Sequence, residues 1–336
     1  MKDYSLAVII PCWNSESYVG AMIECLLRQT FTDWNAFFID DGCTDKTPDI
    51  IKEYSLADSR IVYALRNRGP KGAQTCRNIG FDMSEGAKYV IYFDSDDLVS
   101  PNCFQQRVSY MENHQECDFA VFPAMAFEEK VFDFHDLFFG KKFLDDSLQA
   151  MLNRNLPMVG WTNIYRRDSL VKFNLRWDER LLSMQDSDFN IQALVSGMVF
   201  HFAEGEVDYF YRRTQSGISR KIPSLEHLDS HLCLLSKTLT SVSRTRTNYS
   251  FYLKNYVVLF FKFFQAAPDK FVELINIPWI RKHVGFYLKL YLYYLSGFRG
   301  KKYLFKKQLK YSSELTSRWY SQMKKESETY VNGRLG

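Results

Sequence analysis

Short apolar runs alternate with segments of helical periodicity through the first third of the chain. The runs, each of a length typical of a buried strand, are residues 6–10, 35–39, 61–64 and 89–93. The first run ends at Pro11, and Val19, Met22 and Leu26 then recur on one face of a helix. Strands that are apolar throughout and alternate with helices are typical of a mainly parallel sheet covered on both faces. The pattern therefore predicts an α/β fold.

Two prolines mark where helices are expected to begin. Thr47 is predicted as an N-cap with Pro48 in the first helical position. Ser100 and Pro101 repeat this arrangement ahead of a helix that runs to about Asn113. The alternation of strand and helix thus continues for four rounds.

Polar clusters follow three of the predicted strands. They are residues 11–14 (Pro-Cys-Trp-Asn), 40–45 (Asp-Asp-Gly-Cys-Thr-Asp) and 94–97 (Asp-Ser-Asp-Asp). In open parallel sheets, ligands bind beyond the carboxyl ends of the strands. We therefore expect these three segments, which are far apart in sequence, to line one edge of the sheet and to form the functional site.

Residues 94–97 concentrate three carboxylates, those of Asp94, Asp96 and Asp97. These charges would repel one another without a cation, and carboxylate oxygens suit Mg²⁺ or Mn²⁺, which typically also binds substrate phosphates. The alternative is a loop whose aspartates only cap the helix near Pro101. The position directly after a strand favours the metal site.

Charge divides the chain into two parts. Residues 1–222 carry 24 basic and 32 acidic side chains, a net charge of −8, whereas residues 223–336 carry 19 and 7, a net charge of +12. A shift of this size predicts two functional regions. The first is the α/β domain, and the second is basic, aromatic and helical in periodicity.

The basic region favours docking on an anionic membrane surface, because lysines punctuate its aromatic segments. The alternative is a helical bundle that packs on itself or on the α/β domain. Nucleic acid is a less favoured partner, since no recognised binding motif accompanies the charge. No apolar stretch approaches the ~20 residues of a membrane span, and residues 1–10 lack the features of a secretory signal. We therefore expect a cytoplasmic protein that is peripheral at the inner face of the membrane.

Five motifs, in their order and spacing, resemble the signature of family 2 glycosyltransferases with the GT-A fold. They are residues 8–14 (Val-Ile-Ile-Pro-Cys-Trp-Asn), 29–30 (Gln-Thr), 39–45 (Ile-Asp-Asp-Gly-Cys-Thr-Asp), 77–80 (Arg-Asn-Ile-Gly) and 92–97 (Tyr-Phe-Asp-Ser-Asp-Asp). The resemblance is strong over about the first 100 residues and continues more weakly to Arg220. It implies a GT-A catalytic domain over 1–222, with a donor part of about 1–122 and an acceptor part of about 123–222. The resemblance lapses beyond this domain, and the helical extension expected over 223–336 rests on periodicity and charge.

The resemblance also implies which residues bind a nucleotide diphosphate sugar. Asp41 would accept a hydrogen bond from the base, while Pro11 and Trp13 would flank the base and the ribose. Arg77 matches an arginine near the nucleotide, although taken alone it is as typical of a helix surface. The donor-binding residues that we expect are Pro11, Trp13, Asn14, Asp41, Arg77, Asp94, Ser95, Asp96 and Arg220.

In the same way, Asp96 and Asp97 would bind the Mn²⁺ or Mg²⁺ that bridges the diphosphate of the donor. Arg212, Arg213 and Arg220, with a serine at 219, resemble a segment that closes over the donor phosphates. Arginines that are merely solvated are the alternative for this segment.

Asp186 matches the general base of the family, the group that removes a proton from the acceptor hydroxyl. The family usually has Glu-Asp here, whereas this chain has Gln185 before Asp186, one negative charge fewer. Asp188 is a rival for the role. The alternative for Asp186 is a cap of the helix that this segment begins.

The resemblance implies inverting, metal-dependent transfer of a sugar from a nucleotide diphosphate sugar, expected to be UDP-linked. The acceptor would be a hydroxyl of a saccharide or lipid-linked saccharide in polysaccharide biosynthesis. Trp161 could stack on a sugar ring or belong to the core. One alternative function is a sugar-phosphate nucleotidyltransferase, which ordinarily has a glycine-rich basic loop where this chain has residues 11–14. The other is a non-catalytic nucleotide-sugar sensor or membrane scaffold, which Gln185 would suit.

Overall fold

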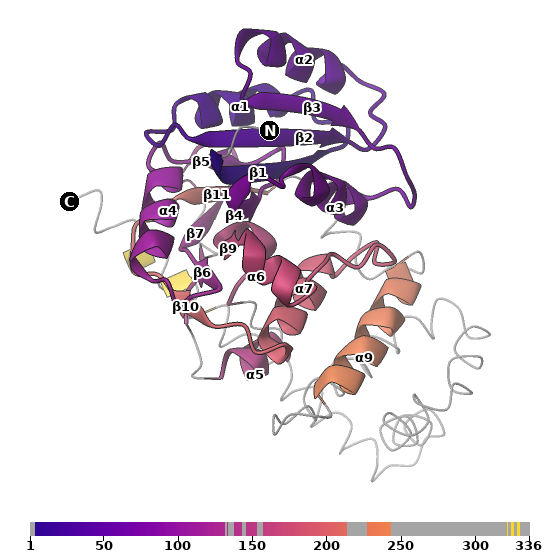
Figure 1. The fold of residues 1–336 in the computed structure, drawn as a ribbon, viewed down its shortest axis with the longest axis vertical. Coiled ribbons are helices and arrows are strands. Elements are labelled where there is room, and N and C mark those ends of the chain that lie inside the picture. Colours follow the sequence, from indigo (N-terminus) through magenta and orange to yellow (C-terminus); the bar gives the residue numbers. More distant parts are fainter. Residues whose placement is uncertain are drawn as a thin grey trace.

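The computed structural model describes residues 4–131, 133, 138–142, 146–152, 157–213 and 227–242, with five positions near the C-terminus (321, 324, 325, 328 and 329). Its centre is a seven-stranded sheet in the order β10-β6-β9-β4-β1-β2-β3 (Figure 1). The strands are β1 (Tyr4–Cys12), β2 (Trp34–Asp40), β3 (Ile61–Leu65), β4 (Ala87–Tyr92), β6 (Phe119–Val121), β9 (Asn163–Arg166) and β10 (Phe200–Phe202). Only β9 runs antiparallel to its neighbours, β4 and β6. The predicted mainly parallel sheet is therefore confirmed.

A second, smaller sheet has the order β5-β11-β7-β8. Its strands are β5 (Leu98–Val99), β7 (Ala124–Phe127), β8 (Phe138–Phe139) and β11 (Tyr209–Arg212). The helices are α1 (Val19–Leu27), α2 (Thr47–Ala57), α3 (Ala73–Met83), α4 (Cys103–Asn113), α5 (Ser147–Leu152), α6 (Arg167–Lys172), α7 (Gln185–Val195) and α9 (Leu228–Val242), with a 3₁₀ turn, η1 (Gly160–Thr162). Because β5 follows the acidic loop 94–97, the second sheet begins at the edge where we expect the site.

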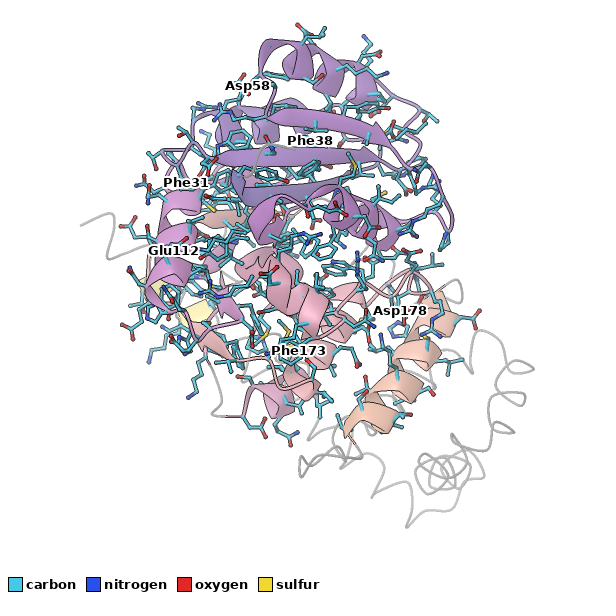
Figure 2. The ribbon with its side chains drawn as sticks, viewed as in Figure 1. Phe31, Phe38, Asp58, Glu112, Phe173 and Asp178 are labelled. Carbon is cyan, nitrogen blue, oxygen red and sulfur yellow. The ribbon has the colours of Figure 1, made fainter. Side chains whose placement is uncertain are left out.

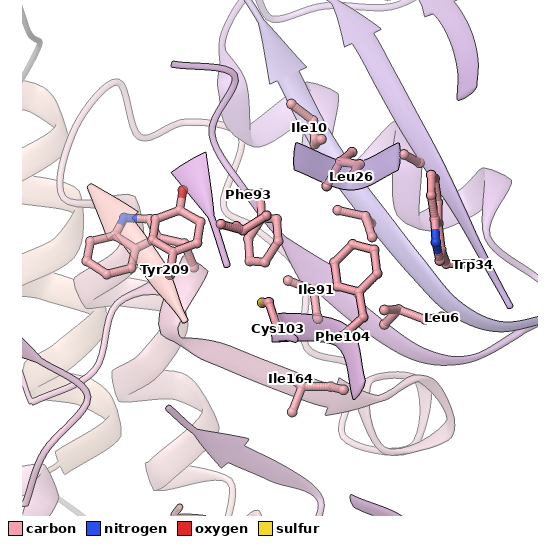
Figure 3. Close-up of a cluster of buried hydrophobic side chains, with 14 of the residues drawn as sticks. Leu6, Ile10, Leu26, Trp34, Ile91, Phe93, Cys103, Phe104, Ile164 and Tyr209 are labelled. Atoms are coloured by element: carbon pink, nitrogen blue, oxygen red, sulfur yellow. The ribbon is translucent and has the colours of Figure 1, made fainter. Parts of the chain in front are cut away.

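Helices cover both faces of the large sheet, which explains why its strands are apolar throughout. Along β1, Leu6 and Val8 join the cluster that includes side chains of α1 and α4, whereas Ala7 joins the cluster that includes those of α3 and α7. Figure 3 shows part of the first cluster, where the rings of Trp34 and Phe104 meet edge to face with their centroids 5.7 Å apart.

The element boundaries differ from those expected in three places. The first strand does not stop before Pro11 but continues to Cys12. A proline is tolerated there because the pairing of β1 with β4 ends at Ile9, so that side of the strand needs no further donor. The two predicted helix starts were wrong in opposite directions: α2 begins at Thr47, one residue before the predicted Pro48, whereas α4 begins at Cys103, with Asn102 as N-cap, two residues after the predicted Pro101.

An ion pair that the sequence did not indicate joins α4 to the second sheet. Arg107 is fully buried and donates from Nε and one terminal nitrogen to the two carboxylate oxygens of Asp208, at 2.8 and 2.7 Å. Its other terminal nitrogen donates to the Trp161 carbonyl at 2.9 Å. Burial lowers the pKa of Arg107, but the charge of Asp208 outweighs it and the net pKa is raised. Arg107 therefore remains charged inside the protein.

We expect Asp208→Ala to lower the free energy of unfolding by about 3–5 kcal/mol, since it leaves a buried guanidinium without its partner. Urea denaturation followed by circular dichroism measures this. The matched control is Glu112→Ala on α4 (Figure 2), which breaks the exposed ion pair of Glu112 with Lys88 of β4 and should cost at most about 1 kcal/mol. Equal losses in the two variants would contradict a structural role for the buried pair.

Helix α9 lies beyond the boundary expected at residue 222, and it packs beside α7 (Figure 1). Leu235, Leu239 and Val242 of α9 are buried in the same cluster as α7 side chains. Among the residues that the structure describes, no helix is long and apolar enough to cross a membrane. The expected membrane-binding aromatic segments of the basic region lie outside the described residues, and the division at 222 stays a prediction.

Candidate active site

The carboxyl ends of β1 and β2 lie side by side and hold Asp41 at the expected edge. The Asp41 N–H donates to the Cys12 carbonyl at 2.9 Å. Its carboxylate, which is buried, accepts hydrogen bonds on Oδ1 from Arg66 Nε at 2.6 Å and from the Gly72 N–H at 3.1 Å. The residue expected to recognise the nucleotide base is thus held rigidly, with one carboxylate oxygen already bonded.

The neighbouring Asp40 has a different task. It accepts hydrogen bonds from the N–H groups of Gly42 and Cys43 and from the Tyr63 hydroxyl, at 2.7–2.9 Å. Burial raises the pKa of Asp40, but these hydrogen bonds outweigh it and hold the pKa below its ordinary value. Asp40 therefore stabilises the turn that presents Asp41.

The loop after β1 carries the residues expected to flank the nucleotide. Trp13 is 46% exposed, and the Lys71 ammonium lies 2.9 Å from a ring centroid of its indole. Asn14 adopts a left-handed conformation (φ +47°) and its Oδ1 accepts a hydrogen bond from the Thr44 N–H at 2.8 Å. Asn14 thus shapes the loop, and Pro11 is buried inside β1, whereas Trp13 and Asn14 are both exposed to solvent.

The three acids after β4 are in unequal surroundings. Asp94 accepts a hydrogen bond from Arg77 at 2.6 Å. Asp97 is buried, and its oxygens accept from the Tyr209 hydroxyl and, at 2.7 Å, from the Arg212 N–H. Among the described residues, no side chain or backbone group of another residue donates a hydrogen bond to the carboxylate of Asp96. Burial and the charge of Asp94 raise the pKa of this carboxyl to about 6. Burial and the charges of Asp96 and Asp94 also raise the pKa of Asp97.

These acids fit a divalent cation whose coordination the substrate completes. Burial and the charge of Asp94 outweigh the charge of Arg212 at Asp96, so the pKa of this carboxyl stays above its ordinary value. Within the described part of the chain, no group of three or more His, Cys, Asp or Glu side chains could hold a metal by itself. Mg²⁺ is usually bound by one or two carboxylates together with substrate phosphates. Asp96 fits this role directly, while Asp97 would first have to release a hydrogen bond.

The alternative in which these aspartates cap a helix is wrong, since no side chain caps α4. Ser95, next to them, is buried. Arg212 donates from Nε to the Asp96 carbonyl at 2.7 Å and lies over the ring of Phe127, 4.4 Å from its centroid. Arg212 is therefore not merely solvated, whereas Ser219 and Arg220 lie outside the described residues.

Arg77 is buried rather than on the surface of α3, so its interpretation as a surface charge is wrong. It is 6% exposed, and its guanidinium lies over the ring of Trp177, 4.5 Å from the centroid. Its terminal nitrogens donate to Asp94 and, at 3.0 Å, to Gln185 Oε1. Although burial lowers the pKa of Arg77, the charges of Asp94 and Asp186 outweigh it and raise the pKa. Arg77 thus connects the acidic loop to the segment of the expected base.

Asp186 lies in the first turn of α7 and accepts a hydrogen bond on Oδ1 from the Gly160 N–H at 2.9 Å. It does not act as the N-cap: that residue is Met184, and no side chain caps α7. A Cβ at position 160 would lie 2.6 Å from Asp186 Oδ1 and 2.8 Å from the Trp177 ring. Only glycine therefore allows this close approach. Burial raises the pKa of Asp186, opposed by the charge of Arg77.

The rival base, Asp188, is committed to another interaction. It is buried, and its Oδ2 accepts a hydrogen bond from the Lys237 ammonium of α9 at 2.6 Å. Lys237 also reaches Asp178 at 3.2 Å, and Figure 2 shows Asp178 beside α9. Burial raises the pKa of Asp188, opposed by Lys237. Asp188 therefore helps to attach α9 to the domain, and the geometry favours Asp186 over it as a base.

Three residues near the site were not anticipated. The Tyr209 hydroxyl accepts from the Asp94 N–H at 3.2 Å and donates to Asp97, so it orders the acidic loop. Gly160 holds Asp186, and Glu179 accepts hydrogen bonds from Arg68 and Asn78. Trp161 is buried and its indole stacks on the ring of Tyr209, with centroids 4.8 Å apart, so it belongs to the core. In the sequence, the signals for these roles were one glycine, Gly160, and the aromatic strand that begins at Tyr209. Both features are too common in proteins to indicate a functional residue.

Comparison with known proteins identifies the domain. Residues 7–173 match the family described as Glycosyl transferase family 2. Through this domain the chain belongs to the family 2 glycosyltransferases, as the ordered motifs implied.

Three relatives illustrate the range of the family. The chain is 26% identical over 239 residues to "Uncharacterized glycosyltransferase EpsJ" of Bacillus subtilis, covering 68% of this chain and 66% of the relative. It is 28% identical to "Minor teichoic acid biosynthesis protein GgaB" of the same organism, covering 65% and 24%. It is 34% identical over 111 residues to "UDP-Glc:alpha-D-GlcNAc-diphosphoundecaprenol beta-1,3-glucosyltransferase WfgD" of Escherichia coli, covering 33% and 42%. The chain thus spans from a quarter to about two thirds of the length of these relatives.

Two solved structures share the fold. TarS 1–349 of S. aureus in complex with UDP-GlcNAc superposes with a TM-score of 0.59 at 15% identity, covering 83% of this chain and 78% of that one. The mannosyltransferase PcManGT of Pyrobaculum calidifontis, in complex with GDP-Man and Mn²⁺, gives a TM-score of 0.53 at 13% identity, covering 100% and 88%. At these identities the comparison establishes the GT-A fold.

Proposed function

We propose that this protein transfers a sugar, with inversion, from a UDP-linked donor to a hydroxyl of a saccharide or lipid-linked saccharide in polysaccharide biosynthesis, with the help of Mn²⁺ or Mg²⁺. The observation that carries the proposal is the arrangement of two carboxylate groups around one buried arginine. Arg77 pairs with Asp94 of the acidic loop and acts electrostatically on Asp186 of α7. The reaction needs acidic side chains at two separate positions: one position binds the cation that stabilises the charged leaving group, and the other supplies the general base.

The names of the comparison proteins support the chemical class. WfgD is named for a UDP-glucose donor and an acceptor linked to diphosphoundecaprenol. TarS was solved with UDP-GlcNAc, and PcManGT with GDP-Man and Mn²⁺. The donor sugar and the linkage of this protein are not specified by these similarities. The net charge of +12 over residues 223–336 supports a place at the anionic inner surface of the membrane, where a lipid-linked acceptor would be reached.

In the proposed reaction, Asp41 and Trp13 bind the nucleotide and Asp96, with Asp97, binds the cation. The cation would neutralise the negative charge that develops on the departing diphosphate. Asp186 accepts the proton of the acceptor hydroxyl, and the Gly160 N–H orients its carboxylate during this step. Because the acceptor attacks directly from the side opposite the diphosphate, a single displacement inverts the anomeric centre.

The test is the product released from a panel of nucleotide sugars, with Mn²⁺ or with a chelator. We expect release of UDP from a UDP-sugar in the presence of an acceptor, and a loss of turnover on chelation that added Mn²⁺ restores. A nucleotidyltransferase would instead release pyrophosphate, and a sensor would release neither. Turnover that persists in full with the chelator would contradict the role given to Asp96 and Asp97.

A further inference from the structure

The side-chain amide of Gln185 joins two helices that carry different parts of the proposed site. Its Oε1 accepts a hydrogen bond from Arg77 at 3.0 Å, and its Nε2 donates to Gln74 Oε1 at 2.7 Å and to the Leu181 carbonyl at 3.0 Å. Gln74 and Arg77 belong to α3, whereas Gln185 is the first residue of α7. The amide next to Asp186 therefore links α7 to the helix that carries Arg77.

The partners of Gln185 fix the orientation of its amide. The Arg77 guanidinium can only donate hydrogen bonds, and the Leu181 carbonyl can only accept them. Position 185 must therefore offer an acceptor on one side and a donor on the other, which an amide does and a carboxylate does not. A glutamate here would place a carboxylate oxygen against the Leu181 carbonyl oxygen.

The neutral amide also affects how the charge of Arg77 is used. Arg77 is buried and pairs with Asp94 at 2.6 Å. Its charge acts on Asp186 as well. A carboxylate at position 185 would compete for the same guanidinium, whereas the amide of Gln185 accepts a hydrogen bond from it without adding a negative charge.

We propose that Gln185 is a positioning residue of the transfer reaction: its neutral amide ties the first turn of α7 to α3 and leaves the charge of Arg77 to be shared by Asp94 and Asp186. This inference rests on the proposed function, in which Asp186 is the base. Its consequence is that glutamate, the residue usual at this position in the family, functions less well in this protein than glutamine does.

The other described groups that face Asp186 do not supply a positive charge in place of that of Arg77. The Gly160 N–H of η1 donates to it, and Tyr165 of β9 and Asp94 are its other titratable neighbours. On α7 itself, the charge of Asp188 is paired with Lys237 of α9. The packed helix α5 has no charged side chain between residues 147 and 152. A new carboxylate at position 185 would therefore act on Asp186 with little compensation.

The test compares Gln185→Glu with Gln185→Met, because both lose the Nε2 hydrogen bonds and only the first adds a charge. We expect kcat for UDP release to fall about 10-fold or more in both, as the base is displaced, with the affinity for UDP nearly unchanged. In Gln185→Glu alone, the acidic limb of the pH profile of kcat should move upward by about 0.5–1 pH unit, since a like charge disfavours the ionised form of Asp186.

The control is Gln105→Glu, the same chemical change on the exposed surface of α4, which should leave kcat and its pH profile unchanged. Thermal unfolding separates folding defects from the proposed effect, because partial unfolding lowers kcat without moving the pH profile. If Gln185→Glu had the kcat and the pH profile of the wild-type protein, this would overturn the inference about Gln185 and leave the proposed function standing. The same upward shift in Gln185→Met would overturn the role of charge. A wild-type protein that releases no UDP from any donor would overturn the proposed function together with the inference.

Discussion

Replacing Asp186 with asparagine should reduce the rate of sugar transfer by about 10²–10⁴-fold, the usual contribution of a general base. Asparagine keeps the shape of the side chain, and its Oδ1 can still accept the hydrogen bond from the Gly160 N–H. It cannot accept the proton of the acceptor hydroxyl. The rate is measured as UDP release with saturating donor and acceptor, and UDP affinity, measured by calorimetry, should stay nearly the same.

The stability of this variant provides an independent check. The pKa of Asp186 is raised in the folded protein, first by burial, so its ionised form is less favourable there than in the unfolded chain. The contribution of this carboxyl to stability is therefore lost as the pH rises from the ordinary aspartate range through its folded pKa. At neutral pH, Asp186→Asn should not lower the thermal midpoint.

Asp188→Asn is the matched control for Asp186→Asn. It removes the charge that pairs with Lys237 at 2.6 Å, so we expect a lower thermal midpoint with kcat little changed while the protein is folded. If Asp188→Asn abolished transfer and Asp186→Asn did not, the assignment of the base would be reversed.

The second large effect is expected for Asp96→Ala. Because the cation and the donor diphosphate bind together in the proposed site, loss of this carboxylate should weaken UDP binding in the presence of Mn²⁺. We expect a loss of at least about 10–100-fold, the range found when groups that only support a metal ligand are removed. Calorimetric titration with UDP, with and without Mn²⁺, measures the effect.

In wild-type protein, Mn²⁺ should increase the affinity for UDP, and in Asp96→Ala this increase should disappear. Asp49→Ala, which removes an exposed aspartate from α2, is the control and should leave the increase intact. An unchanged increase in Asp96→Ala would place the cation elsewhere and would remove the basis for the role of the acidic loop.

Hydrophobic pattern alone was enough to predict the donor side of the fold. The runs at 6–10, 35–39, 61–64 and 89–93 all became strands of the large sheet, because a strand buried on both faces has few polar positions. Helix ends were less well predicted. Ser100 and Pro101 are typical of a helix start, yet they directly follow β5, and a turn at residues 101–102 separates that strand from α4, which begins at Cys103.

The interactions that distinguish similar residues could not be predicted. The sequence offered Asp186 and Asp188 two positions apart on one helix, and their different roles come from Gly160 and Lys237, which are distant in the chain. In the same way, Arg77 is typical of a helix surface until the burial of α3 against β1 and β2 is known.

The sequence by itself determined the alternation of strands and helices, the edge at which the polar loops gather and the family to which the domain belongs. These follow from local periodicity and from motifs whose order is written along the chain. Only the tertiary structure decided that Asp188 is paired with Lys237, and that Asp94 and Asp186 share the positive charge of Arg77. Those properties depend on burial and on contacts between side chains up to about a hundred residues apart, such as that of Arg77 with Gln185, and no local pattern contains them.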